Sequence, residues 1–421
     1  MDLSINIGGV RFKNPIMAGA GPETRNLTNV KLGVDAGCGA LVIRSLHLKE
    51  LSDKRAGAHR EFWHVYQSPQ GFKKGHSYGF QSTGCPSARV TPLDPGFGGG
   101  SERPTLKEYT KIVADMVEYA HAQDCRIIAS IGLCGHRRPP DECWAAEAEA
   151  MARAGVDGIE VHTSPSPSTE GPRFIQLDPQ KYLIDPIQIA KRESGLPVWA
   201  KVGMDGCDTI AACKIAEEAG AAAVVPVTRW ASMNIDLDNP FEKTWGLPGY
   251  GGPWSAPIMT ALIYRMLHPT PPLAGNIGIP IVASGGIFDG DDILRYVLAG
   301  ALGMQVCSQF LLEGYGIVAP MLKRMEAWME QHGFARLEDF RGKVQIVGSD
   351  PSQRSGMDEF EPTVDDDSCI GCGLCVDACW NQAIQVSGTA QIDKVRCQGC
   401  RNCHYVCPSK AISIRRLKKA N

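Results

Sequence analysis

The chain has 421 residues, of which 43% are hydrophobic and 21% are charged, and its formal net charge is −3. Proteins that bind nucleic acid or an acidic membrane surface usually carry a surplus of basic residues. This near-neutral net charge argues against both functions. No stretch reaches the roughly 18 apolar residues of a membrane span, and residues 1–12 lack the basic and apolar regions of a signal peptide. Sixteen cysteines in such a chain predict a reducing cytoplasm, with metal binding or catalysis in place of disulfides.

Residues 1–340 alternate short β-branched runs with longer amphipathic stretches. Strands are expected at 14–20, 40–45, 126–132, 156–161, 197–202, 222–227, 279–284 and 302–307. Helices are expected at 26–36, 105–122, 140–154, 178–194, 208–219, 256–267, 289–299 and 313–332. Eight strands, each followed by a helix, predict an α/β fold of the (β/α)8 TIM-barrel type. A doubly wound open sheet is the alternative, but no G-x-G-x-x-G follows the first strand, which also argues against a nicotinamide site.

Two insertions, 46–104 and 229–254, follow strand ends and are rich in aromatic residues. They are expected at the catalytic face of a barrel. Local packing of long loops is one interpretation, and an aromatic-walled substrate cavity that includes Arg229, Trp230 and Trp254 is the other.

Two strand ends of the predicted barrel carry residues that suit a cofactor. Ser284-Gly285-Gly286 ends the seventh strand, where bare backbone N–H groups form a phosphate cradle in barrels, although alone this triplet is only a turn. Lys201 ends the apolar strand VWAKV, and burying its charge is expensive. A salt bridge to Glu160 is one interpretation of Lys201, and a cation beside N1 and O2 of a flavin is the other.

Eight cysteines near the carboxyl end stand in two runs, each spaced C-x2-C-x2-C-x3-C. This spacing lets three thiolates of one loop bind one cubane while the fourth reaches the other cluster. We therefore expect one [4Fe-4S] cluster on Cys369, Cys372, Cys375 and Cys407. A second is expected on Cys397, Cys400, Cys403 and Cys379. Zinc ribbons space their C-x2-C pairs further apart, so residues 367–421 resemble the small α+β two-cluster ferredoxin domain of bacteria, joined to the barrel (1–340) by a polar linker (341–366).

Several barrel segments resemble the dihydroorotate dehydrogenase family: NIGGVRFKNPIMAGAG, RIIASIGLCG, PVWAKVG and IPIVASGGIFDGDD. The resemblance covers nearly the whole chain, and the two-cluster tail makes it nearest to the FMN and iron–sulfur subunit of dihydropyrimidine dehydrogenase. It implies an FMN barrel in which Lys201 is the flavin lysine. It also implies flavin contacts from Ala18, Gly19, Ala20, Arg44, Ser45, Thr228, Ser255, Ala256, Gly285, Gly286, Cys307 and Ser308.

Three strand ends depart from the family pattern. Relatives end strand 2 with Lys-Thr, strand 4 with Asn-Leu-Ser-Cys-Pro and strand 6 with Thr-Asn-Thr. This chain has Arg-Ser at 44–45, His-Thr-Ser-Pro-Ser at 162–166 and Val-Thr-Arg at 227–229. The amide side chains that bind a pyrimidine in relatives are missing, so another substrate is expected, and reduction of uracil or thymine is the named alternative. Arg44 and Arg229 suit a carboxylate or another anion.

The departure at strand 4 also removes the cysteine that trades a proton with the substrate in relatives. His162 titrates near neutrality, and Ser164 and Ser166 occupy the same loop. We expect the proton donor to be His162 with Ser166, and Cys85 is a further candidate. Loop serines more often form turns, and a lone cysteine is usually inert.

The resemblance implies an oxidoreductase acting on CH–CH (or CH–NH) groups. Electrons would pass through two [4Fe-4S] clusters to FMN and, as a hydride, to a C=C (or C=N) bond of a planar cyclic or conjugated substrate. The alternative is a flavin and iron–sulfur electron-transfer subunit of a larger complex, without an organic substrate of its own. Electrons are expected from ferredoxin or a separate FAD/NAD(P)H subunit, in a homodimer or hetero-oligomer.

Overall fold

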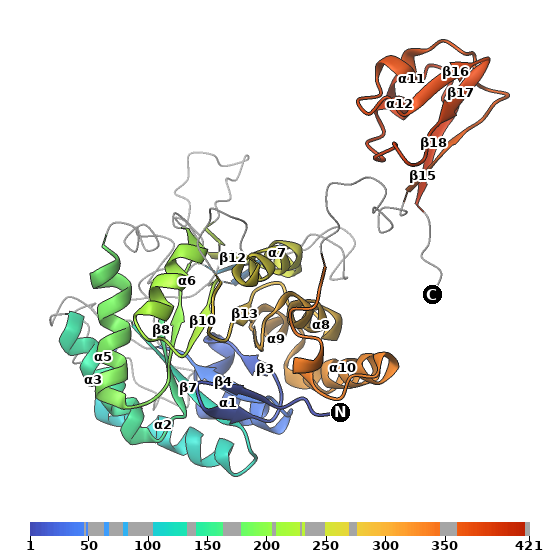
Figure 1. The fold of residues 1–421 in the computed structure, drawn as a ribbon. Helices are drawn as coiled ribbons and strands as arrows, with labels where there is room; N and C mark the ends of the chain where they lie inside the picture. Colours follow the sequence, from blue (N-terminus) through green and yellow to red (C-terminus); the bar gives the residue numbers. More distant parts are fainter. Residues whose placement is uncertain are drawn as a thin grey trace, which may run out of the picture. The chain divides into compact units, whose positions relative to one another are not determined.

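The computed structural model divides the chain into two compact units, Met1–Lys343 and Val344–Asn421. It describes residues 1–45, 48, 63–66, 79–82, 104–132, 140–162, 178–203, 208–227, 230–231, 249–268, 276–345 and 360–416. The first unit carries the alternating strands and helices, and the second carries the two cysteine runs (Figure 1).

An eight-stranded parallel sheet in the order β10-β9-β8-β7-β4-β3-β14-β13 forms the centre of the first unit. Its strands are β3 (Ile16–Ala18), β4 (Ala40–Ile43), β7 (Arg126–Ile131), β8 (Gly158–His162), β9 (Val198–Lys201), β10 (Ala223–Val225), β13 (Val282–Ser284) and β14 (Gly303–Val306). A parallel bridge between Val224 and Ile281 joins the two ends of this order, and the Val224 N–H donates to the Pro280 carbonyl at 3.0 Å. The sheet therefore closes on itself, and the predicted TIM-barrel fold is confirmed.

Helices connect the strands and surround the sheet (Figure 1). They are α1 (Leu27–Asp35), α2 (Leu106–His121), α3 (Pro140–Ala154), α5 (Asp185–Ser194), α6 (Thr209–Glu218), α7 (Ala256–Leu267), α8 (Gly290–Ala299) and α10 (Val318–His332). Helix α2 shows why they form. Thr105 and Glu108 make a reciprocal capping box at its start, and its buried side chains recur at helical spacing from Tyr109 to Ala120.

Two helices differ from the sequence expectation. The segment expected as one helix at 178–194 begins with a π-helical turn, η3 (Gln180–Ile184), before α5. Pro186 has no N–H to donate to the preceding turn, which favours this wider turn. The helix expected at 313–332 begins later, at Val318, and follows α9 (Ser308–Glu313) and a 3-10 turn, η5 (Tyr315–Ile317), because Gly314 at φ +73° ends α9 and redirects the chain.

Two small antiparallel sheets were not predicted. Strands β1 (Ile5–Ile7) and β2 (Val10–Phe12) form a hairpin whose turn, Gly8-Gly9, has φ of +63° and +87°. The two insertions, expected as loop-rich, contribute to one sheet in the order β11-β12-β6-β5. Its strands are β5 (Trp63–Tyr66), β6 (Gly79–Ser82), β11 (Trp230–Ala231) and β12 (Gly249–Gly251), so segments far apart in sequence pair through β12 and β6.

The second unit is built from two strand pairs and two short helices. Strand β15 (Phe360–Val364) pairs with β18 (Ile412–Arg416), and β16 (Ile384–Ser387) pairs with β17 (Thr389–Ile392). The helices are α11 (Leu374–Asp377) and α12 (Asn402–Val406). Strand β15 lies in the segment that was expected to be a linker, so the linker gives this unit one of its strands.

Candidate active site and cluster sites

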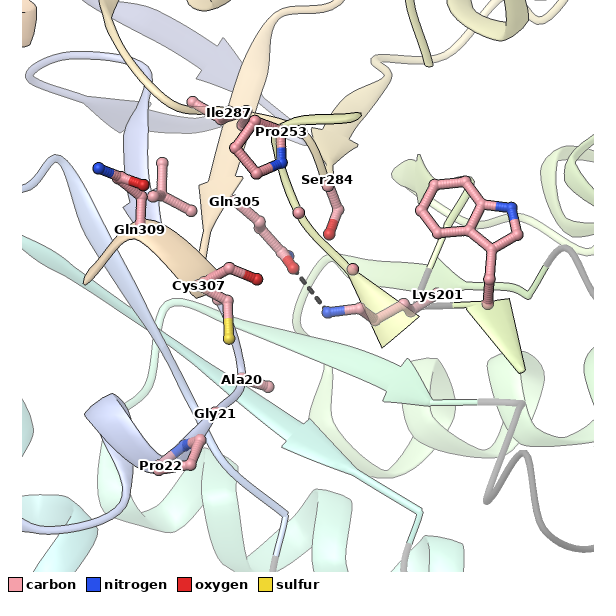
Figure 2. A pocket seen from close by; sticks show the side chains of 18 of the residues that line it. Ala20, Gly21, Pro22, Lys201, Pro253, Ser284, Ile287, Gln305, Cys307 and Gln309 are labelled. Carbon is pink, nitrogen blue, oxygen red and sulfur yellow. Dashed lines mark hydrogen bonds between the residues drawn. The ribbon is translucent and has the colours of Figure 1, made fainter. Parts of the chain in front are cut away.

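A pocket lies at the carboxyl ends of β3, β4, β9, β13 and β14, the end where parallel barrels place their functional residues (Figure 2). Glycine-rich strand ends give it bare backbone walls at 19–21, 251–252 and 285–286. Its polar and charged lining side chains are Arg44, Lys201, Ser284, Gln305, Cys307, Ser308 and Gln309.

Lys201 is held by a buried polar triangle. Its Nζ donates to Gln305 Oε1 at 2.6 Å and lies 3.3 Å from Glu160 Oε1, while Gln305 Nε2 donates to Glu160 Oε2. Lys201 is 6% exposed and Glu160 is 0% exposed. A lysine can only donate and an ionised carboxylate can only accept, so the amide of Gln305 is oriented by both neighbours.

The structure shows the salt bridge that was one interpretation of Lys201, and it places the same ammonium in the pocket that the other interpretation requires. The ammonium forms the salt bridge to Glu160, and it also lines the pocket (Figure 2). A buried ion pair of this kind holds its charges in place and adds little net stability. Gln305 was missed by the sequence analysis, although an amide within the apolar strand GMQV was a signal for a buried polar contact.

The wall at Gly285 and Gly286 fits a phosphate better than a side chain. Their φ values are +86° and +76°, which non-glycine residues rarely adopt. A Cβ on Gly286 would lie 2.5 Å from the backbone N of Ala256, where α7 begins after the 3-10 turn η4 (Pro253–Ser255). The missing side chains let the end of β13 approach α7, and bare backbone beside the start of a helix suits an anion.

The structure brings most of the residues expected to bind the flavin to this one pocket. Those that line it are Gly19, Ala20, Arg44, Lys201, Gly285, Gly286, Cys307 and Ser308. The other expected residues are not among those that line it: Ala18, Ser45, Ser255 and Ala256. Ala18 is buried in β3. The Ser45 hydroxyl donates to Ser130 Oγ, and the Ser255 hydroxyl donates to the Gly252 carbonyl. Thr228 lies outside the described residues.

The structure describes only some of the residues that were expected to act on the substrate. Trp230 lines the pocket, and Trp254 packs against it with ring centroids 4.9 Å apart. His162 ends β8 in register with Lys201 on the neighbouring strand, but it is not among the lining residues. Four residues, Cys85, Ser164, Ser166 and Arg229, lie outside the described residues.

Glu23, which the sequence analysis missed, lies in the wall beside Cys307. It belongs to the 3-10 turn η1 (Pro22–Thr24) and is 6% exposed. Burial raises the pKa of Glu23 to about 7, against the opposing influence of the Cys307 thiol and of the cations Arg44 and Lys201. Burial likewise raises the pKa of the Cys307 thiol well above its ordinary value, so this sulfur is a neutral neighbour.

The eight cysteines of the second unit gather in the two expected sets. Cys369, Cys372, Cys375 and Cys407 surround one cavity, and Cys379, Cys397, Cys400 and Cys403 surround another. Among the described residues, no three His, Cys, Asp or Glu side chains converge closely enough to hold one metal ion. Four thiols around a cavity suit a cubane, whose irons are spread over its corners.

Backbone N–H groups point at sulfurs of both sets. The Ala383 N–H donates to Cys379 Sγ at 3.2 Å, and the Ala390 N–H donates to Cys369 Sγ at 3.4 Å. Such bonds stabilise the negative charge on cluster ligands and are one of the means by which a protein sets a cluster potential.

No helix in the described part of the chain is both long and apolar enough to cross a membrane. The model of the family described as dihydroorotate dehydrogenase matches residues 2–329, and that of the 4Fe-4S dicluster domain matches residues 362–414.

Three characterised proteins illustrate the similarity. The NAD-dependent dihydropyrimidine dehydrogenase subunit PreA of Escherichia coli is 26% identical over 99% of this chain and 96% of its own length. The chloroplastic dihydropyrimidine dehydrogenase (NADP(+)) of Arabidopsis thaliana is 24% identical over 81% of this chain and 76% of its own length. The catalytic subunit of dihydroorotate dehydrogenase B (NAD(+)) from Caldicellulosiruptor bescii is 24% identical over 82% of this chain and all of its own length.

Proposed function

The chain belongs to the dihydroorotate dehydrogenase family, and from that premise we propose that its barrel pocket reduces a C=C (or C=N) bond of a small planar anion. With its dicluster domain, it is an FMN- and iron–sulfur-dependent oxidoreductase that acts on CH–CH groups. The observation that carries the proposal is a single pocket in which two cations, Arg44 and Lys201, share a lining with the bare backbone of Gly285 and Gly286.

The residues of the pocket have distinct parts to play. Bound FMN supplies hydride chemistry. The backbone at Gly285 and Gly286 suits its phosphate, and the ammonium of Lys201 suits the part of the ring where negative charge develops. Because Glu160 and Gln305 fix the ammonium before any ligand binds, little reorganisation is needed when that charge appears.

An anionic substrate follows from what lines the pocket and what does not. Arg44 gives the lining a guanidinium, which binds carboxylates through two parallel hydrogen bonds. The amide side chains that would bind the edges of a neutral pyrimidine are absent from the corresponding strand ends at 162–166 and 227–229.

We assign proton transfer to His162 assisted by Ser166 or Ser164. The position of His162 at the end of β8, in register with Lys201, supports the assignment. If His162 donates the proton, the His162→Asn variant will lose turnover and the alkaline limb of the pH profile, where the donor is deprotonated, while flavin binding stays unchanged. Retention of the wild-type pH profile would contradict the assignment.

Electrons are proposed to enter from a separate donor protein. The cluster unit exposes large apolar side chains next to its ligands, with Trp380 88% exposed beside Cys379 and Tyr405 76% exposed near Cys407. Such residues suit contact with another protein. We expect the Trp380→Ser variant to slow reduction by ferredoxin or a flavoprotein subunit without changing reduction by dithionite.

Anaerobic titration tests the proposed function. The protein is reduced with dithionite and then mixed with uracil, with orotate as a planar carboxylate, or with a protein acceptor. Rapid reoxidation of the flavin by the planar carboxylate, weakened in an Arg44→Gln variant, is the expected result. Reoxidation by uracil alone would contradict the anionic substrate, and reoxidation by proteins alone would favour an electron-transfer subunit.

A further inference from the structure

The wall of the flavin pocket contains a buried acid to which the proposed function gives no role. Glu23 follows two lining residues, Gly21 and Pro22, and its carboxylate folds back over Gly21. A Cβ on Gly21 would clash with Glu23 Oε2, so the glycine leaves the space that the carboxylate occupies.

Distant parts of the barrel hold Glu23 in this position. The Tyr315 hydroxyl, from η5, donates to the Glu23 backbone carbonyl at 2.7 Å. Asn29 Nδ2 donates to the Pro22 carbonyl at 3.1 Å, which fixes the same turn against α1. The acid is therefore part of a built wall, not a surface side chain that happens to be covered.

Among the described residues, the Cys307 thiol, a weak donor, is the side chain that opposes the burial of the Glu23 carboxylate by hydrogen bonding. Neither oxygen has a stronger donor in this part of the chain, in contrast to the carboxylate of Glu160 in its triangle with Lys201 and Gln305. The charged and titratable groups that face Glu23 are the Cys307 thiol, Arg44 at the end of β4, Lys201 at the end of β9 and the Tyr315 hydroxyl. An ionised carboxylate so poorly solvated is costly, and binding a proton removes the cost.

We propose that Glu23 is the group that binds a proton when the flavin in this pocket is reduced, so that it couples the cofactor potential to pH. The inference rests on the proposed function, because it requires FMN in the pocket. Two electrons delivered by the cluster unit would be accompanied by one proton on the bound flavin, which leaves one added negative charge in the pocket. A second proton from solvent would form an O–H bond on Glu23 and cancel that charge, and both protons would return to solvent on reoxidation.

The ionisation behaviour of Glu23 fits this role. A pKa of about 7 leaves the carboxyl partly ionised at neutral pH, and added negative charge in the pocket raises that pKa further. Between the oxidised and reduced pKa values, reduction takes up one proton more than the flavin itself requires. Between those pKa values the FMN potential should fall by about 30 mV more per pH unit than it does with the flavin's own proton alone, because one extra proton accompanies two electrons.

Spectroelectrochemistry of the anaerobic holoprotein between about pH 6 and pH 9 tests the proposal, with Glu23→Gln and a matched control, Glu313→Gln, an exposed acid on α9. We expect Glu23→Gln to match the wild type at pH 6, to have a higher FMN potential at pH 9 and to lose the steeper segment. The Glu313→Gln variant should follow the wild type. Parallel curves for wild type and Glu23→Gln would overturn the role of Glu23 and leave the proposed function standing.

A second measurement begins with the wild type. Its reduced-minus-oxidised infrared spectra at pH 8 should show a growing carbonyl band from a protonated carboxylic acid, and the conservative Glu23→Asp variant should shift that band and so assign it. Absence of that band from FMN-containing protein would overturn the role of Glu23. Absence of FMN from every preparation would overturn the proposed function and this inference with it.

Discussion

The cluster unit and the barrel hold their redox groups in different ways. In the described part of the cluster unit, five buried side chains pack together as a core, and two of them, Cys375 and Cys403, belong to the metal sites. The barrel instead has a continuous core that reaches every strand of its parallel sheet, and its pocket wall is completed by internal hydrogen bonds. We expect a core so small to need its clusters in order to fold. The hydrogen bonds of the barrel wall, by contrast, are made by the chain's own residues.

The largest expected effect comes from removing a cluster ligand. The Cys375→Ser variant should unfold the second unit, lower the iron content from about eight to about four or fewer, and abolish donor-dependent turnover. The barrel should still bind FMN. Iron analysis together with circular dichroism checks this, and Cys38→Ser, which changes a buried cysteine of the barrel, is the control. A Cys375→Ser protein with a full iron content would remove the contrast between the units.

Breaking the Lys201 triangle should destabilise the barrel by about 3–5 kcal/mol. Lys201→Met leaves the wholly buried carboxylate of Glu160 without its cation. The double variant Lys201→Met/Glu160→Gln removes both charges and should recover much of that loss, while flavin binding stays weak in both. Urea unfolding followed by the barrel tryptophans provides the measurement. A double variant no more stable than Lys201→Met would show that the buried pair is not the cause.

Glu23 should make the stability of the flavin-free barrel depend on pH. Its pKa is raised from an ordinary 4.5 to about 7 in the folded state, so folded protein binds the proton more tightly than unfolded protein. The stability contributed by proton binding to Glu23 is fully present below about pH 4.5 and is lost as the pH rises through 7. Above that range the free energy of unfolding no longer changes with this group. We therefore expect Glu23→Gln to match the wild type near pH 4.5 and to exceed it above pH 7 by at most about 3 kcal/mol. Equal unfolding midpoints at pH 8 would contradict the burial of an ionisable Glu23.

The smallest effect is expected at the cap of α8, close to the glycine wall. Asp289 Oδ1 accepts from Asp291 N at 2.9 Å and from Asp292 N at 3.2 Å. The Asp289→Ala variant should lose about 1 kcal/mol of stability, as N-cap removals do. Its affinity for FMN should change little, because the wall is also fixed by Tyr296, whose hydroxyl donates to the Gly285 carbonyl. Isothermal titration of the flavin-free protein with FMN measures that affinity, and a large loss would show that the wall depends on its cap.

The two regions also differ in how far the sequence predicts them. The cysteine sets could be predicted from spacing, because three thiols of each set lie close together in one run and the two runs repeat the same C-x2-C-x2-C-x3-C pattern. The eight barrel strands could be predicted because each is a short run of apolar, mostly buried residues, as in ALVI at 40–43. These signals are local in the sequence, and they can be recognised without knowledge of the fold.

The polar wall of the pocket depends on contacts between residues far apart in the chain. Glu23 lies in a polar turn that looks exposed, and its burial depends on Gly21 and on Tyr315, 292 residues away. Pairing of β12 with β6 joins two insertions through backbone bonds that leave no pattern in the side chains. The Gly8-Gly9 hairpin and Gln305 did have signals in the sequence, a two-glycine turn and an amide in an apolar strand, although neither feature was predicted.

The central claim, that electrons pass through paired clusters to a flavin in the barrel, is tested most directly by cofactor analysis of the full chain purified without oxygen. The account predicts about eight irons and one FMN per chain, with the flavin lost from Lys201→Met and the irons retained. Zinc in place of iron, or a wild-type protein without flavin, would contradict it.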